Sequence, residues 1–279
     1  IALGHPIRAA KALPDMFRAM RSEEGQHAVN QEIAKRKNFP LYQQAGLFLS
    51  EHGQKLSQME EQYMSRWAEK IPLVSHSGRA YTTFLNRLRA DSFDAMADSL
   101  ARNKELTPAE AKAIGNYVNA ATGRGKLGTK ENALVGLNTI FFAPRYVASR
   151  FQMIIGQPLY RGTARTRMLI AKDYARFLIG VGVVYGLAQM DDKSQVETDP
   201  RSSDFGKIRF GNTRLDPLAG LNQSTVLLSR LGSGKTKSIG GKVTPIRGDK
   251  VPFGTGNSAD VMSRFLRSKL APVPGMVVD

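Results

Sequence analysis

The sequence contains no cysteine among its 279 residues, and its four histidines all lie within the first 76 positions. Without thiols the chain can form neither a disulfide nor a thiolate metal site. His5, His27, His52 and His76 include no His-x-x-x-His pair, and no carboxylate stands at a spacing that would complete a ligand set. We therefore expect neither a metal nor another cofactor.

Familiar catalytic motifs are missing as well. No G-x-S-x-G nucleophile motif occurs, and neighbouring Glu60 and Glu61 would point about 100° apart on a helix, which does not suit paired acid and base catalysis. Residues 234–236 (GKT) match the end of a phosphate-binding loop, but Ser229 stands where its first glycine belongs. The preceding residues 224–231 are typical of a helix, whereas that loop follows a strand. We predict that the chain is not an enzyme.

Acidic residues are also scarce. The chain has 24 Asp and Glu against 40 Lys and Arg, for a formal net charge of +16. The excess is concentrated in residues 101–190, which hold 13 basic and only 4 acidic residues. A field of this sign favours anionic partners such as nucleic acid.

No hydrophobic run is long enough to cross a bilayer as one helix. The apolar stretch 177–188 has 12 residues, or about 18 Å of helix against a hydrocarbon core of about 30 Å. Contact with a membrane surface remains open. Gly182 and Gly186 lie in this stretch at the spacing of a close helix–helix contact, and we predict that they pack against a helix of this chain or of another copy.

The helix expected from about Thr163 to Met190 carries a cationic stripe before its apolar end. At about 100° per residue, Arg165, Lys172 and Arg176 lie within about 40° of one another, and Arg161 joins them if the helix starts early enough. The same line continues through apolar residues to Met190. Such a helix could follow phosphates with its first half or lie at a headgroup boundary with its second. The alternative is a solvated charged face followed by a buried end.

Aromatic and basic residues alternate in FFAPRYVASRF (residues 141–151). The aromatic rings could stack on bases while Arg145 and Arg150 hold phosphates, although core packing around Pro144 explains the aromatic residues equally well. The glycine-rich loop at 123–128 presents two further cations and is expected to be mobile or to touch a ligand.

The expected fold is mainly α. Residues 1–190 form a multi-helix array, with capping boxes at Ser57–Glu60 and Thr107–Glu110. Pro144 and Pro158 are expected to divide residues 134–160 into short helical pieces. Residues 191–279 form a linker followed by a turn-rich basic region that holds short strands and two further helices. In that region we expect a linker at 191–204, a strand at 207–210, a helix opened by Asp216-Pro217 and ended by Gly232, a hairpin through Gly240-Gly241, and a helix at 258–270.

Five phrases resemble the large polyvalent protein-associated domain of very long multidomain proteins from bacteriophages and related mobile elements. They are GRGKLG (123–128), FFAPRYVASRF (141–151), GQPLYRG (156–162), SSDFGKIRFGNTRLDP (202–217) and RFLRSKLAPVP (264–274). The resemblance runs from about Trp67 to the C-terminus, and residues 204–216 are its most specific part. It implies a segment of a longer phage protein that is packaged in the virion and delivered with the genome. No catalytic residue is carried over.

Together these observations predict a structural segment of an internal or ejected virion protein. Its expected partners are phage DNA, other virion proteins and other copies of itself, and its expected location is the phage particle, with delivery into the host envelope or cytoplasm. The alternatives are a nucleic-acid-binding module of a virion-carried enzyme such as an RNA polymerase, and a channel component at the inner membrane. The candidate contacts to nucleic acid or a partner are cationic: Arg124, Lys126, Arg145, Arg150, Arg161, Arg165, Lys172, Arg176, Lys207, Arg209 and Arg214.

Overall fold

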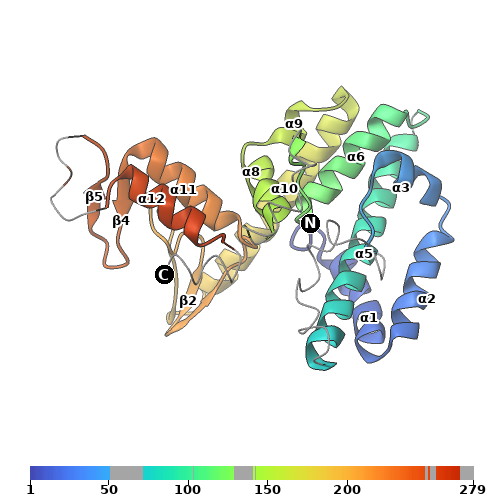
Figure 1. Ribbon diagram of the computed structural model, residues 1–279, viewed down its shortest axis with the longest axis horizontal. Coiled ribbons are helices and arrows are strands. Elements are labelled where there is room, and N and C mark those ends of the chain that lie inside the picture. The colour runs from blue at the N-terminus through green and yellow to red at the C-terminus, as the bar shows by residue number, and fades with distance from the viewer. Residues whose placement is uncertain are drawn as a thin grey trace. The chain divides into compact units, whose positions relative to one another are not determined.

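The computed structural model describes residues 1–50, 72–102, 104–128, 141, 143–248, 251 and 256–270 (Figure 1). The mainly helical fold is confirmed, with ten helices and two small antiparallel sheets in these residues. The chain divides into two compact units: unit 1 comprises Ile1–Asn138 and Ala143–Phe177, and unit 2 comprises Thr139–Phe142 and Leu178–Asp279. The division expected from the sequence lies at residue 190.

Unit 1 is a helical array whose boundaries follow local capping signals. Its helices are α1 (Pro6–Arg21), α2 (Glu23–Ala34), α3 (Phe39–Ala45), α5 (Pro72–Ala101), α6 (Pro108–Ala121), α8 (Pro144–Ile154), α9 (Gln157–Tyr160) and the start of α10 (Ala164–Gln189). The expected capping box at Thr107 opens α6, and Pro144 opens α8 as expected. The box expected at Ser57 lies outside the described residues.

The core of unit 1 forms where α3, α5 and α6 meet. Tyr42 and Phe93 are fully buried and pack edge to face with their ring centroids 5.2 Å apart. The Tyr42 hydroxyl donates a 2.6 Å hydrogen bond to Asp94, so the buried ring keeps a polar partner. At Gly115 of α6 a Cβ atom would stand only 2.7 Å from the Ala45 carbonyl oxygen of α3. This glycine therefore allows the two backbones to approach closely.

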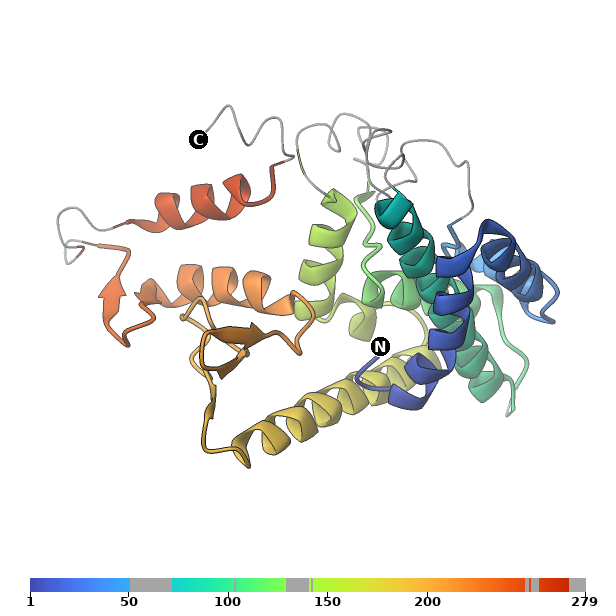
Figure 2. The same cartoon turned by 90° about the horizontal axis from the view of Figure 1, so that it is seen from below.

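Unit 2 contains the rest of α10, two sheets and two helices. The first sheet has the order β1 (Ser194–Val196), β2 (Ile208–Phe210), β3 (Thr213–Leu215), and the second pairs β4 (Lys235–Lys237) with β5 (Val243–Pro245). The helices are α11 (Leu221–Ser233) and α12 (Ser258–Arg267), which lie side by side (Figure 2). The strand expected at 207–210, the hairpin through Gly240-Gly241 and the last helix are confirmed.

Three details of unit 2 differ from the sequence expectation. The expected linker 191–204 contains β1, which pairs with β2. Asp216 does not open α11, because its carboxylate accepts bonds from the amides of Leu218 and Gly220, both at 2.9 Å, and so fixes a turn before the helix. Gly234 rather than Gly232 ends α11, since it adopts the left-handed conformation with φ +67°. The GKT segment thus follows a helix and enters a strand, the reverse of a phosphate-binding loop.

Candidate nucleic-acid interface

The exposed residues among the predicted contacts include Lys126, Arg161 and Lys172. Within the described residues, none of the three has a carboxylate within ion-pairing distance. Arg161 is not on α10, because it has extended backbone angles and the helix begins at Ala164 after the Thr163 hydroxyl accepts from the Thr166 amide. The option that Arg161 extends the helical stripe is therefore wrong, although its side chain stays exposed.

Arg176 is also accessible, with 56% of its side chain exposed. Its nearest carboxylate is Asp173, whose Oδ1 lies 4.0 Å from the guanidinium. Asp173 is already bonded to His5 and to the Tyr117 hydroxyl, the latter at 2.6 Å. Burial acts to raise the pKa of Asp173, but these two bonds outweigh it and leave the pKa below the ordinary value. Arg176 is thus a weakly paired cation next to Lys172.

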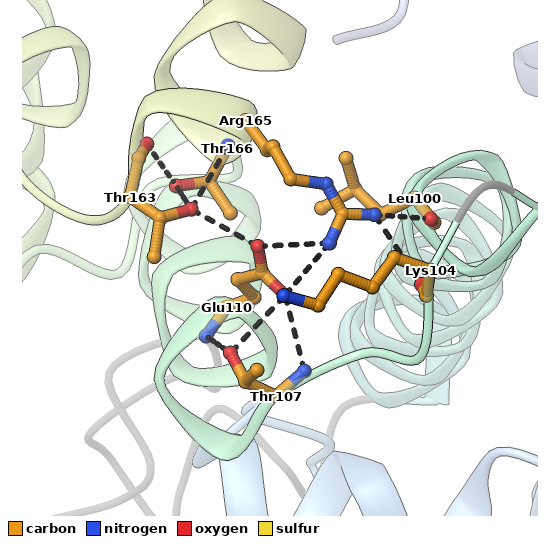
Figure 3. Close-up of polar contacts among 7 residues, drawn as sticks. All are labelled: Leu100, Lys104, Thr107, Glu110, Thr163, Arg165 and Thr166. Carbon is orange, nitrogen blue, oxygen red and sulfur yellow. Dashed lines mark hydrogen bonds and ion pairs between the residues drawn. The ribbon is translucent and has the colours of Figure 1, made fainter.

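Arg165 is held inside unit 1 by a polar network at the start of α6 (Figure 3). Its guanidinium donates to both carboxylate oxygens of Glu110, at 3.3 and 3.4 Å, and to the carbonyl oxygens of Leu100 and Lys104. Its side chain is 32% exposed, whereas that of Glu110 is 3% exposed. The prediction that Arg165 contacts nucleic acid or a partner is corrected, because its guanidinium N–H groups already donate to the buried Glu110 carboxylate.

Glu110 can hold Arg165 because it also caps α6. Its carboxylate accepts from the Thr107 amide and hydroxyl, each at 3.1 Å, and from the Thr163 hydroxyl at 3.1 Å. The bond from the Thr107 amide is the largest cause of a lowered Glu110 pKa, and burial opposes it. One carboxylate therefore joins the beginning of α6 to the beginning of α10, both within unit 1.

The cations on α8 and in the loop at 123–128 that precedes it include three that are buried or half-buried. Arg124 is 5% exposed, and its guanidinium lies 3.3 Å from the centre of the Phe48 ring. Arg150 lies 4.2 Å from the centre of the Tyr146 ring, and Arg145 is half-buried. The prediction that Arg124 is a surface contact is wrong, and Tyr146 stacks on an arginine of its own helix.

The glycine-rich loop is also packed. A Cβ atom at Gly125 would stand 2.3 Å from the Ser149 amide nitrogen of α8, and the Gln152 side chain bonds to both backbone groups of Lys126. These contacts pack the loop against α8, and its expected mobility or contact with a ligand stays a prediction. Of its two cations, only Lys126 is exposed.

In unit 2 the predicted cations surround one carboxylate. Asp204 accepts from Lys207 at 3.0 Å and from Arg214 at 2.8 Å, which ties the turn before β2 to β3. Arg209 is exposed and donates to the Gly211 carbonyl oxygen at 2.9 Å. Lys207 and Arg214 thus have a structural role in unit 2, although Arg214 is exposed, as is Arg209.

We expect Asp204→Asn to lower the free energy of unfolding at neutral pH, because it removes the ion pairs with Lys207 and Arg214. The loss should be only about 1 kcal/mol, since both ion pairs are partly exposed. Partial burial acts to raise the pKa of Asp204, but the bonds from Arg214 and Lys207 lower it. This contribution to stability is therefore present above the unfolded pKa of about 3.9 and is lost as the pH falls through the folded pKa. Urea unfolding at pH 7 and pH 3 should show a smaller acid loss in Asp204→Asn than in the wild type; equal losses would contradict the assignment.

The second half of α10 bears an exposed apolar face. It comprises Gly182, Gly186 and four large side chains of the helix, Leu178, Ile179, Val183 and Leu187, together with Met190 directly after it; these five large side chains are 57% to 81% exposed. The alternative of a buried helix end is therefore wrong for this face. Among the described residues, no heavy atom lies within 4 Å of a Cβ built at Gly182 or Gly186, so neither glycine packs closely against a described part of the chain. Contact with another copy stays a prediction.

Sequence reasoning missed one exposed cation of α10, Arg167. At about 100° per residue it lies about 200° around the helix from Arg165, outside the predicted stripe. The stripe was aligned on Arg165, the member that the structure buries against Glu110. A helix wheel centred on Lys172 would still not have included Arg167, because the sequence does not indicate how much of the helix is covered.

No family model, curated protein or solved structure matches this chain. The resemblance to the phage domain therefore stays a prediction. Across the described parts of the chain, no group of three His, Asp or Glu side chains is arranged to hold a metal ion. In those same parts, no helix combines the length and the apolar character that a bilayer crossing requires.

Proposed function

We propose that this chain is a structural, non-catalytic segment of a bacteriophage internal or ejected virion protein, which contacts DNA and assembles with other virion proteins or with copies of itself. The observation that carries the DNA contact is that four of the predicted contact cations in unit 1 are accessible: Lys126, Arg161, Lys172 and Arg176. The phage context rests on the phrases that resemble the large polyvalent protein-associated domain.

Accessible cations of this kind suit the phosphate backbone better than base edges. Lysine and arginine at a surface neutralise phosphates and release condensed counterions, which gives affinity without sequence information. The cations that are buried or paired, such as Arg124 and Arg165, cannot contribute without giving up their present contacts. The proposed contact is therefore smaller than the formal charge of +16 suggests.

We expect DNA binding that weakens steeply as salt increases, by about 0.9 logarithmic units in affinity per tenfold salt for each neutralised phosphate. Fluorescence anisotropy with a labelled duplex at a series of salt concentrations measures this slope. Replacing Arg161, Lys172 and Arg176 together with Gln should reduce the slope by up to about three contacts.

The matched control replaces Arg21, Lys35 and Lys37 with Gln, since these are exposed cations on and after α1 and α2. It removes the same charge and should leave most of the slope in place. A wild-type protein that fails to bind duplex at low salt, or equal effects of the two triple variants, would contradict the proposed contact.

A further inference from the structure

The apolar face of α10 lies opposite the side of the helix that packs within unit 2. Val181 and Ala188 are buried, and the Tyr185 hydroxyl donates a 2.6 Å bond to the Gly206 carbonyl oxygen. At about 100° per residue these three positions lie on average about 150° from the centre of the exposed face. One side of the helix thus packs within unit 2, and the exposed apolar face is not used in that packing.

The apolar face combines a ridge and a groove. Ile179, Val183 and Leu187 recur every four residues and form a ridge, while Gly182 and Gly186 form a parallel row without side chains. The open space at both glycines means that no described part of this chain fills the row. A ridge beside a groove of the same spacing is complementary to itself, since a two-fold axis places each ridge in the other groove.

The chemistry of the face favours a second copy over an ionic partner. No charged residue occurs from Phe177 to Met190, so the face offers nothing to phosphates. At about 100 Å² of apolar surface for each of its large side chains, two copies would bury about 1,000 Å², which is the lower limit for a specific interface. Exposed apolar surface of this extent marks a contact site.

We propose that two copies of this chain associate through the apolar face of α10, with the ridge of each copy lying in the glycine row of the other. The inference rests on the assembly part of the proposed function and names its surface. It is independent of the DNA contact, because none of the cations assigned to DNA belongs to this face.

The test is sedimentation equilibrium of the full chain at rising concentrations in the absence of lipid. The wild type should form dimers, and Val183→Glu should raise the dissociation constant at least about tenfold because it buries an unpaired charge. Met168→Glu is the matched control: Met168 is an exposed apolar residue of the same helix in unit 1, and its variant should dimerise like the wild type. Circular dichroism should show the same helix content for all three.

A second variant tests the groove. Gly186→Leu adds apolar surface but fills the glycine row, so it should also weaken dimerisation. A nonspecific hydrophobic association would instead become stronger, because the variant exposes more apolar surface. A wild type that stays monomeric, a dimer that survives both variants, or a Met168→Glu variant that dissociates equally would each overturn the proposal. Association seen only with phosphatidylglycerol vesicles would also overturn it, in favour of a lipid surface.

The same variants separate this inference from the proposed function. Val183→Glu should keep the salt-dependent DNA affinity of the isolated chain. DNA binding without dimers would remove only the inference, and dimers without DNA binding would remove only the proposed DNA contact.

Discussion

Replacing Arg165 with Gln is expected to lower the free energy of unfolding by about 2 to 3 kcal/mol, because it leaves the buried Glu110 carboxylate without its cation. The loss should be smaller than for a fully buried pair, since about a third of the Arg165 side chain is exposed and Glu110 keeps its bonds from Thr107 and Thr163. Urea unfolding followed by circular dichroism measures the change.

Lys172→Gln provides the control on the same helix. Lys172 is exposed and has no carboxylate partner among the described residues, so its replacement should change stability by less than about 0.5 kcal/mol. In a Glu110→Gln background, Arg165→Gln should cost much less than in the wild type. Additive effects of the two substitutions would show that the ion pair does not couple α6 to α10.

Gly115→Leu is the second substitution expected to have a large effect, with a loss of about 3 kcal/mol from overpacking. The first side-chain atom would already meet the Ala45 carbonyl oxygen at 2.7 Å, and backbone cannot move aside as a flexible side chain can. The displacement would also strain the two bonds by which Asn119 holds the chain after α3, to the Phe48 amide and the Gly46 carbonyl oxygen.

The comparison is Gly186→Ala, another helical glycine but one with open space around it. At concentrations where the chain is monomeric, this change should raise stability by up to about 1 kcal/mol through helix propensity. Thermal unfolding of the wild type and of both variants measures these changes as shifts in melting temperature. Equal destabilisation by both, or a neutral Gly115→Leu, would show that the distinction between a packed and an open glycine is wrong.

Local signals predicted much of the fold. The capping box at Thr107, the start of α8 at Pro144 and the hairpin through Gly240-Gly241 depend on residues within a few positions of one another. The β1 strand was missed because it is only three residues long and exists through pairing with β2, which the polar composition of 191–204 does not reveal.

The candidate site was predicted less well, because exposure and pairing depend on distant residues. Arg165 and Glu110 are 55 positions apart, and the residues next to Arg165 in the sequence do not indicate that it pairs with a carboxylate. Arg124 has a comparable partner in Phe48, far earlier in the chain. Helical periodicity aligned Lys172, Arg176, Ile179 and Val183 on one side of α10, and the structure exposes all four. Periodicity could not separate these residues from Arg165, which turns inward.

The uncharged stretch from Phe177 to Met190 also has a consequence for how the two proposed contacts respond to their surroundings. Added salt screens attraction between exposed charges but does not weaken apolar association. Concentrated salt should therefore strip nucleic acid from the protein while leaving paired copies together, and dilution of the salt should restore DNA to an assembly that has stayed intact. A change in ionic strength would thus release or rebind DNA without separating the associated copies of the chain.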